Sequence, residues 1–512
     1  MSLILKPGTS WQELYSRCVE VAPEAFHDDR LLNYYGGRWR REGEASLATS
    51  PIDGTAIGGP PRMGHDGALA AVEAAVEEHR EWGKVPIEDR KARVTSALDD
   101  LQEHRDLLSL LLVWEIGKPW RLATADVDRC IEGVRWYVDE IDQMLEGRTP
   151  LAGPVSNIAS WNYPMSVLMH AMLVQVLAGN AAIAKAPTDG GVSCLTLATA
   201  LAARHGLPLT LISGSGGELS PVLVGSDDIG CLSFVGGRGV GSEIVAGLDA
   251  NKRHVLEQEG LNCWGIWEFG DWESLGPQIR KAFDYAKQRC TAYPRYVVQR
   301  QLFDEFLAVY LPAVEQVAFG HPLAVESEED PLPQLDFGPL INDAKAKELA
   351  DMVDEAVRMG GVPLYRGSLA DGRFLPGQDT DAYLPPVAIL APPRSSPLHH
   401  AEPFGPIDTI VLVDTEAELL AAMNASNGAL VATLACDDEA AARRLSADLQ
   451  AFKIGINKPR SRGDREEVFG GRGASWRGAF VGGALLVHAV TEGPPGERLY
   501  GNFPSYSLYP PT

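Results

Sequence analysis

Short apolar runs alternate with helical segments between residues 155 and 257, and this alternation constrains the fold more than any other feature of the chain. The runs have the length of buried strands, the segments between them carry apolar residues at helical spacing, and glycine-rich turns separate the two. This order predicts a parallel, doubly wound sheet. Ligands of such sheets bind beyond the carboxyl ends of the strands. The expected strands are residues 155–159, 181–186, 209–213, 231–235 and 252–257.

The same alternation returns after residue 263, so the sequence predicts an α/β fold with two doubly wound parallel-sheet domains. In this second part the expected strands are residues 263–269, 296–299, 387–390, 409–413 and 430–435. The expected helices are residues 277–288, 303–319 and 343–359. Before residue 155 the pattern is helical over residues 66–115 and 123–145, and a strand is expected at residues 31–39.

Length and composition exclude several classes of function. The 512 residues suffice for two or three domains. A formal charge of -24 argues against a nucleic-acid partner, because phosphate binding needs concentrated Lys and Arg. No apolar run reaches membrane-spanning length, and the N-terminal one is too short for a signal peptide. We therefore expect a cytoplasmic protein that binds neither nucleic acid nor membrane.

The cysteines support a reducing compartment and give no metal site. They are seven in number, widely spaced and without a CxxC pair. His399, His400 and Glu402 form an incomplete ligand set, so no metal is expected.

One cysteine, Cys290, lies between the expected helix 277–288 and a β-type run at residues 296–299. Helix-terminal amides can lower the pKa of a thiol and hold an oxyanion, which suits a nucleophile. An isolated cysteine is more often a small buried hydrophobe, so Cys290 by itself does not decide the function.

Several motifs occur around Cys290 in a fixed order. They are Gly117-Lys118-Pro119, Trp161-Asn162-Tyr163-Pro164, Lys185 and Glu257 at strand ends, Glu402-Pro403-Phe404-Gly405-Pro406, and Phe469-Gly470-Gly471 with Ser475. Together with Cys290 they resemble the aldehyde dehydrogenase superfamily from about residue 51 to residue 478. Two of its motifs, the residues next to Cys290 and Asn457-Lys458-Pro459, are most similar to those of the succinylglutamate semialdehyde dehydrogenase-like branch of this superfamily.

The resemblance implies an NAD(P)-dependent oxidation of an aldehyde to a carboxylic acid. Cys290 would attack the aldehyde to form a thiohemiacetal, and later a thioester. The oxyanion would lie between the Cys290 backbone N–H and the Asn162 side-chain amide. Glu257 would activate the water that hydrolyses the thioester.

The resemblance also implies the cofactor contacts. Lys185 would bind the adenosine ribose, Glu402 the nicotinamide ribose, and Phe404 would lie beside the nicotinamide. The remaining expected cofactor contacts are Trp161, Gly236, Gly237, Arg238 and Gly241. The glycines do not satisfy the ordinary dinucleotide fingerprint, since no acidic residue follows at the usual distance.

Cofactor choice is expected to depend on Thr188. Many NAD-preferring relatives carry Glu at this position, where it would repel a 2′-phosphate. Thr188 removes that repulsion, so NADP is the preferred expectation and NAD the second.

Two departures from the family pattern concern turnover. Glu259 stands where the family usually has a small residue, and the first expectation is that it points to solvent. The alternative is that its charge raises the pKa of Glu257 or that its bulk restricts the movement of Glu257. Val235 and Gly237 replace a common Thr and Ser, which would weaken or relocate nicotinamide binding.

The substrate is expected to be a small aldehyde with a remote anionic group. Arg289 adjoins the nucleophile, and Arg460, Arg462 and Arg465 lie in the loop that closes the substrate entrance in this family. The alternative is that neighbouring carboxylates pair these arginines at the surface. His170 and Phe469 are further expected substrate contacts, although His170 could equally be a packed histidine.

Two other functions stay open. One is a CoA-acylating dehydrogenase or reductase, against which Glu257 argues, and the other is a catalytically silent member that serves as a binding subunit. The resemblance divides the chain into a Rossmann-like NAD(P)-binding domain (residues 1–130 and 151–258), a catalytic domain (residues 259–478) and a small β oligomerisation flap (residues 131–150 and 479–512). A homodimer or homotetramer is expected.

Overall fold

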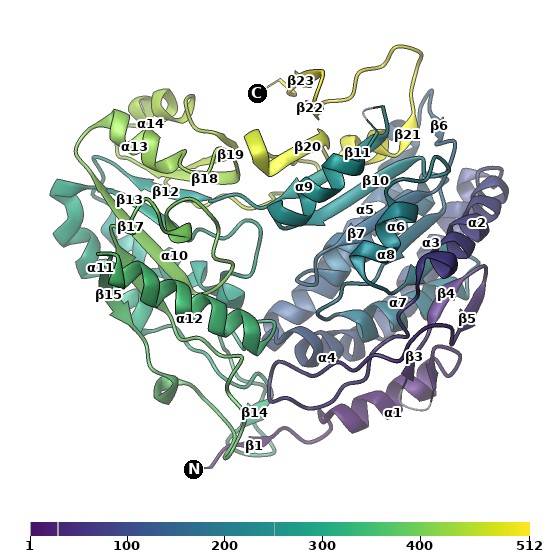
Figure 1. Cartoon of the computed structure of the whole chain (residues 1–512), viewed down its shortest axis with the longest axis horizontal. Coiled ribbons are helices and arrows are strands. Elements are labelled where there is room, and N and C mark those ends of the chain that lie inside the picture. Colours follow the sequence, from purple (N-terminus) through teal and green to yellow (C-terminus); the bar gives the residue numbers. More distant parts are fainter. Residues whose placement is uncertain (1, 28–29, 250, 512) are drawn as a thin grey trace.

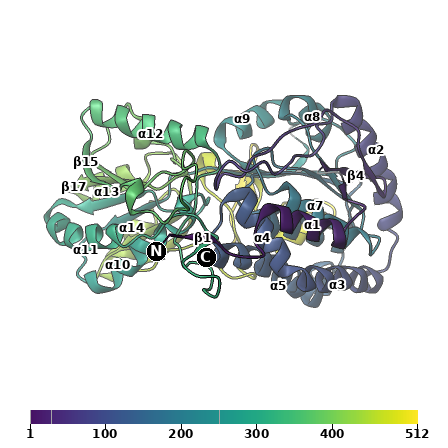
Figure 2. The same ribbon diagram turned by 90° about the horizontal axis from the view of Figure 1, so that it is seen from below.

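A computed structural model of the chain describes residues 2–27, 30–249 and 251–511. The described residues form two lobes, each built on one large sheet, and the lobes lie side by side in both views (Figures 1 and 2). One sheet has ten strands and the other has seven. The fold is α/β with two mainly parallel sheets, which confirms the predicted fold class.

The centre of the first sheet consists of five parallel strands. They are β7 (Val155–Ala159), β8 (Ala182–Lys185), β9 (Leu209–Ile212), β10 (Cys231–Gly236) and β11 (Arg253–Gln258). Their order is β11-β10-β7-β8-β9, so the chain changes direction across the sheet between β7 and β10. A ligand site is expected at the carboxyl ends of strands that flank such a switch point.

Helices cover both faces of this sheet (Figure 1). Those within the alternation are α6 (His170–Leu177), α7 (Val192–Ala203), α8 (Gly216–Leu223) and α9 (Arg238–Gly247). The helical region that precedes it contains α2 (His65–Trp82), α3 (Ile87–Glu103), α4 (Arg105–Ile116) and α5 (Trp120–Met144). Every residue of α4 from Leu107 to Ile116 is buried, and the helix ends at Gly117, whose φ of 67° favours glycine.

The expected strand at residues 31–39 is wrong, because the chain turns back within it. β4 (Asn33–Tyr35) and β5 (Arg38–Arg40) form a hairpin at the edge of the first sheet, and residues 30–31 form a separate strand, β3 (Arg30–Leu31), that pairs with β2 (Phe26–His27). Gly36 and Gly37 connect the hairpin with φ of 58° and 66°. Two consecutive positive φ angles match the right-handed twist of the strands, which is why two glycines make this turn.

The second sheet has the order β15-β16-β17-β13-β12-β18-β19, and every strand pair in it is parallel except β15 with β16. Its strands are β12 (Cys263–Ile266), β13 (Arg295–Gln299), β15 (Val362–Arg366), β16 (Val387–Leu390), β17 (Ile407–Val413), β18 (Ala429–Ala435) and β19 (Ala451–Ile456). Its helices include α10 (Trp272–Ala282), α11 (Phe303–Glu315), α12 (Asp343–Arg358), α13 (Glu416–Met423) and α14 (Glu439–Ser446).

The C-terminal segment returns to the first sheet. β20 (Trp476–Ala479) pairs antiparallel with β11, and β22 (Gly501–Phe503) and β23 (Tyr506–Leu508) continue the sheet outwards. Between them, α15 (Ala484–Ala489) leads to β21 (Thr491–Glu492), which pairs with β6 (Thr149–Pro150).

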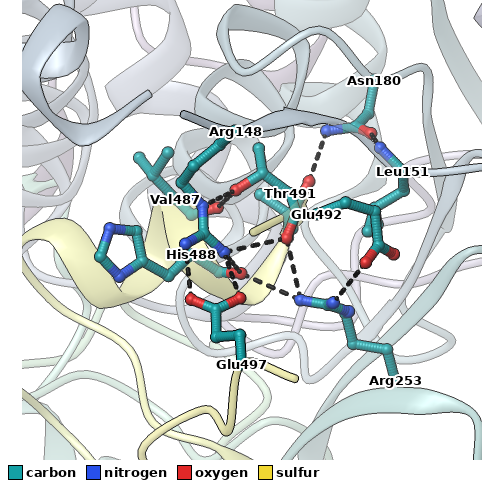
Figure 3. A network of polar contacts seen from close by, with 10 residues as sticks. Arg148, Leu151, Asn180, Arg253, Val487, His488, Thr491, Glu492 and Glu497 are labelled. Carbon is teal, nitrogen blue, oxygen red and sulfur yellow. Dashed lines mark hydrogen bonds and ion pairs between the residues drawn. The ribbon is translucent and has the colours of Figure 1, made fainter. Parts of the chain in front are cut away.

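Two partly buried arginines hold this returning segment in place (Figure 3). Arg148 donates hydrogen bonds to the backbone oxygens of His488 and Thr491 and forms an ion pair of 2.6 Å with Glu497. Arg253, from β11, donates to the same two backbone oxygens and pairs with Glu492 at 3.0 Å. The segment after α15 is therefore fastened to β6 and to β11 by charge-assisted hydrogen bonds.

None of the helices in residues 2–27, 30–249 and 251–511 combines the length and the apolar character that crossing a membrane requires. Within the same residues, no group of three or more His, Cys, Asp or Glu side chains has a geometry that could hold a metal ion.

Candidate active site

Cys290 lies in a turn that an unusual backbone conformation positions. The predicted helix 277–288 is wrong at its end, because α10 stops at Ala282 and the next three-residue stretch is left-handed. The φ angles of Tyr285, Ala286 and Lys287 are 59°, 52° and 57°. Such angles are unfavourable for residues with a side chain and persist only where the surroundings hold them.

Buried polar contacts from distant parts of the chain hold this stretch. The Tyr285 N–H donates to the backbone oxygen of Asp336 at 2.9 Å, and Lys287 pairs with Asp408 at 2.8 Å in the core. The side chain of Gln288 donates to the Pro339 oxygen and accepts from the Ile341 N–H at 3.0 Å. Together these contacts place the residues that lead into Cys290.

The Glu257 carboxylate lies close enough to the Cys290 thiol to act on it through its charge and a side-chain hydrogen bond. Glu257 is the fifth residue of β11 and is buried, whereas Cys290 remains partly exposed. Burial, followed by the Glu257 charge and this hydrogen bond, raises the pKa of the Cys290 thiol well above its usual value, and the positive charge of Arg462 opposes the rise. The resting nucleophile is thus a thiol that has a carboxylate as its proton acceptor.

Asn162 reaches the same turn from the first sheet. It follows the carboxyl end of β7, and its Nδ2 donates to the Gln288 backbone oxygen at 3.0 Å. An amide nitrogen has two N–H groups, so one orients the side chain and the second is left for another acceptor. The structure therefore brings Cys290, Glu257 and Asn162 together from three distant parts of the sequence.

The chain after Asn162 begins as a π-helix, Pro164–Met169, before α6. A buried ion pair between Lys118 and Asp126, at 2.7 Å, supports it, because Asp126 also accepts the Ser166 N–H at 2.8 Å. The Lys118 ammonium lies 3.8 Å from the centre of the Tyr163 ring. Sequence reasoning found Lys118 through its motif but missed Asp126, whose position inside a helix gave no local signal.

The expected cofactor residues line the carboxyl ends of β7, β8 and β10. Lys185 ends β8, and its ammonium donates to the Thr188 hydroxyl at 3.2 Å, while burial lowers its pKa. Trp161, beyond β7, packs edge-to-face on Phe404 with ring centres 6.0 Å apart.

Glu402 is a buried carboxylate without a partner. Neither of its oxygens has a hydrogen-bond donor, and neither is exposed to solvent. Burial, and then the charges of Glu259 and Glu257, raises the pKa of Glu402 well above its usual value. Orphaned buried oxygens need an explanation, and the hydroxyl groups of a ribose are the kind of donor that they lack. This site therefore fits the sugar of a nucleotide cofactor.

The glycine turn at the start of α9 has two different functions in the structure. Gly236 and Gly237 lead into the amino end of α9, where backbone N–H groups are free to bind an anion. Gly241 is a packing residue, because a Cβ there would lie 2.6 Å from the Gln258 side-chain oxygen. Arg238 donates to the backbone oxygens of Ser426 and Glu259 at 3.0 and 3.1 Å, so its guanidinium joins the two lobes.

The arginines of the 460–465 loop differ in what they contact. Arg460 pairs with Glu467 at 2.6 Å and Arg465 pairs with Glu132 at 3.0 Å, so surface pairing accounts for both. Arg462 has no carboxylate partner among the described residues, and its guanidinium stacks 4.9 Å from the centre of the Phe469 ring. The sequence motif gave no means of telling Arg462 from its neighbours.

His170 and Arg289 flank the same region. The His170 ring packs on Tyr137 with ring centres 5.7 Å apart. Burial and the charges of Arg462 and Arg465 lower the pKa of His170 to about 3, so it is neutral. Arg289 donates a hydrogen bond from Nη2 to the Ala282 oxygen at 3.2 Å and has no carboxylate partner among the described residues.

A family profile described as Aldehyde dehydrogenase family matches residues 39–492. The chain belongs to this family. Curated relatives of this aldehyde dehydrogenase include glutarate-semialdehyde dehydrogenase of Pseudomonas putida, which is 24% identical and aligns over 84% of this chain and 90% of the relative. The NADP-dependent succinate-semialdehyde dehydrogenase of Escherichia coli is 25% identical over 84% of this chain and 90% of its own length.

A solved structure with the same fold is NADP-dependent glyceraldehyde-3-phosphate dehydrogenase from Bacillus halodurans, complexed with NADP. It has a TM-score of 0.81 and 24% identity, and the match covers 90% of this chain and 97% of that one. The two-lobed architecture of this aldehyde dehydrogenase is therefore that of its family.

Proposed function

We propose that the protein oxidises an aldehyde to a carboxylic acid with NADP or NAD, using Cys290 as nucleophile. The observation that carries this proposal is the contact between the Cys290 thiol and the Glu257 carboxylate beside Asn162. A nucleophile adjacent to a base, with an oriented donor nearby, is the arrangement that covalent catalysis at a carbonyl requires.

Each of the three residues has a distinct task. Glu257 accepts the Cys290 proton, and the thiolate attacks the aldehyde carbon to form a thiohemiacetal. The free N–H of Asn162 and the Cys290 backbone N–H stabilise the oxyanion, and one such donor contributes about 2.7–4 kcal/mol. A bound nicotinamide would supply the acceptor for the hydride that the thiohemiacetal loses when it becomes a thioester. Glu257, after losing its proton to solvent, then activates the hydrolytic water.

The cofactor would be held at the switch point of the first sheet. Lys185 and Thr188 are placed to bind the adenosine ribose, and the partnerless Glu402 carboxylate to bind the other ribose. Trp161, Phe404, Gly236 and Gly237 complete this region, whereas Arg238 is engaged with backbone oxygens and is not available as a phosphate clamp. The hydroxyl of Thr188 favours NADP over NAD, because it does not repel a 2′-phosphate.

The substrate would be a semialdehyde, an aldehyde with a remote carboxylate. Arg462 and Arg289 are the two cations near the nucleophile that have no carboxylate partner among the described residues. A guanidinium binds a carboxylate with two parallel hydrogen bonds. The names of the relatives, glutarate-semialdehyde and succinate-semialdehyde dehydrogenase, agree with this class, and the narrower succinylglutamate semialdehyde branch is the version of it that the motifs favour.

The test is cofactor reduction with a panel of aldehydes, with and without CoA. The wild type should reduce NADP with a semialdehyde in the absence of CoA, and Cys290→Ala should abolish this reaction. Cys436→Ala is the matched control, since Cys436 is a buried free thiol at the end of the second sheet, remote from Glu257 in the sequence. Turnover only with CoA would favour the acylating alternative, and no turnover with any aldehyde would favour the silent member.

We also propose the assembly and location of the protein. The proposed units are an NAD(P)-binding domain (residues 1–130 and 151–258), a catalytic domain (residues 259–478) and a flap (residues 131–150 and 479–512). The two separate sheets support the first two units, whereas residues 131–144 lie in α5 and β22 and β23 extend the first sheet. A homodimer or homotetramer is proposed for solution. All seven cysteines are free, as in proteins of the reducing cytoplasm. Light scattering of the purified protein tests the assembly, and a monomer would contradict it.

A further inference from the structure

Glu259 places a carboxylate close to the amino end of α9, which begins at Arg238. It follows β11 by one residue, and its side chain is half-buried between the two lobes. A Cβ built on Gly237, the residue that precedes α9, would lie 3.5 Å from the Glu259 Oε2. The carboxylate of Glu259 thus stands beside the glycine that opens the helix.

The amino end of α9 is otherwise suited to an anion. Gly237 caps the helix without a side-chain hydrogen bond, and a Cβ at Gly239 would meet no atom within 4 Å. The first N–H groups of a helix attract negative charge. A second observation points to a ligand in this region, because both oxygens of Glu402 are buried and lack a donor.

Negative charge predominates around Glu402, although the charges of Lys345 and Arg238 partly offset it. The charges of Glu259 and Glu257 both act on Glu402, and both raise its pKa. Arg238, the first residue of α9, donates its hydrogen bonds to the backbone oxygens of Ser426 and Glu259 and not to a carboxylate. No ion pair is formed by Glu259 among the described residues. An incoming anion therefore meets a carboxylate at the point where the helix would bind it.

We propose that Glu259 is a determinant of cofactor affinity, whose carboxylate at the amino end of α9 weakens binding of the dinucleotide diphosphate. This inference rests on the proposed use of NADP or NAD. Like charges a few ångströms apart in a partly buried site repel strongly. The diphosphate of either cofactor is affected equally, so Glu259 sets the affinity for both and leaves the choice between them to Thr188.

The experiment measures the dissociation constants of NADP and NAD by titration calorimetry of the free enzyme, without aldehyde. Glu259→Gln removes the charge and keeps the shape, and it should bind both cofactors about 10-fold or more tightly than the wild type. Glu259→Asp keeps the charge and should bind both cofactors as weakly as the wild type does. Glu243→Gln is the matched control, because Glu243 is an exposed carboxylate on the same helix.

Salt gives a readout that a merely structural effect would not change. Ions screen repulsion between charges. The ratio of the wild-type dissociation constant to that of Glu259→Gln should therefore fall as ionic strength rises from about 0.01 M to 1 M. The inference would be overturned if wild type and Glu259→Gln had equal dissociation constants for the cofactors. It would also be overturned if Glu243→Gln gained as much cofactor affinity as Glu259→Gln.

The outcome can be separated from that of the proposed function. If semialdehyde oxidation proceeds but Glu259→Gln binds no more tightly, this inference alone fails. If Glu259→Gln binds more tightly but no aldehyde is oxidised, the proposed activity alone fails. If no variant binds either dinucleotide, both fail.

Discussion

The carboxylate of Glu257 acts on the thiol of Cys290 through its charge and a side-chain hydrogen bond, although 33 positions separate the two residues. Glu257 lies in β11 of the first sheet, and Cys290 lies in the turn that precedes β13 of the second. The contact raises the pKa of the thiol and at the same time supplies its proton acceptor. Nucleophile activation is thus coupled to the protonation of one carboxylate, and this coupling gives the first prediction.

Glu257→Gln should make Cys290 more reactive while it stops turnover. Removal of the negative charge lowers the thiol pKa, so more thiolate is present at any pH below that pKa, and the midpoint of alkylation against pH moves downwards. Each unit of lowered pKa increases the thiolate fraction about 10-fold. Iodoacetamide labelling of Cys290 as a function of pH measures the shift. A midpoint that stays or rises would show that Glu257 does not control the thiol.

Asn162→Ala should lower kcat about 100- to 1,000-fold, because it removes one donor to the oxyanion. The loss should appear in kcat rather than in KM, since the donor acts on charge that develops in the transition state. Steady-state kinetics with a semialdehyde measure it. An unchanged melting temperature would exclude unfolding as the cause, and an unchanged kcat would contradict the assigned role.

Arg462→Met should raise KM for a semialdehyde but not for a neutral aliphatic aldehyde of similar length. Loss of a charge-assisted hydrogen bond of about 1.5–3 kcal/mol corresponds to roughly 10- to 100-fold in KM. Arg460→Met is the matched control, because Arg460 is already paired with Glu467. Equal effects of the two substitutions, or equal effects on both aldehydes, would argue against a carboxylate contact at Arg462.

Thr188→Glu should shift the preference from NADP to NAD. The new carboxylate would lie beside Lys185, whose ammonium contacts the Thr188 hydroxyl in the structure, and it would repel a 2′-phosphate. The ratio of kcat/KM for NADP to that for NAD should fall about 10-fold or more. A wild-type ratio well below one would contradict the preference for NADP from the start.

Arg148→Ala should destabilise the returning C-terminal segment by about 3 kcal/mol, because Glu497 loses its ion-pair partner. The backbone oxygens of His488 and Thr491 also lose one of their two arginine donors and keep only Arg253. Hydrogen exchange should increase first at residues 488–497, and the melting temperature should fall. Arg443→Ala, which removes an exposed pair with Glu439, should change neither. Equal exchange in both variants would mean that the network of Figure 3 does not fasten the segment.

Local sequence determined much of the fold. The apolar runs that become β7, β10, β16 and β18 are long enough and apolar enough to be buried strands whatever packs on them, and their predicted positions agree with the structure within one or two residues. The motif order also predicted that Cys290, Glu257 and Asn162 would meet. The predicted strand at residues 31–39 was wrong because the chain turns at Gly36 and Gly37. Apolar and aromatic residues continue on both sides of that turn, so the sequence pattern did not reveal it.

The sequence by itself determined the strands, the helices and the residue types that chemistry at a carbonyl needs, because periodicity and side-chain chemistry are local properties. Only the tertiary structure decided how they are used. Residues 285–287 are left-handed because Asp336, Asp408 and Pro339 hold that stretch from elsewhere in the chain. Arg462 is left without a carboxylate partner because Glu467 and Glu132 pair with its neighbours. Contacts between residues so distant in sequence leave no local pattern. Their contribution to the free energy depends on the distance between the two side chains, and only folding fixes that distance.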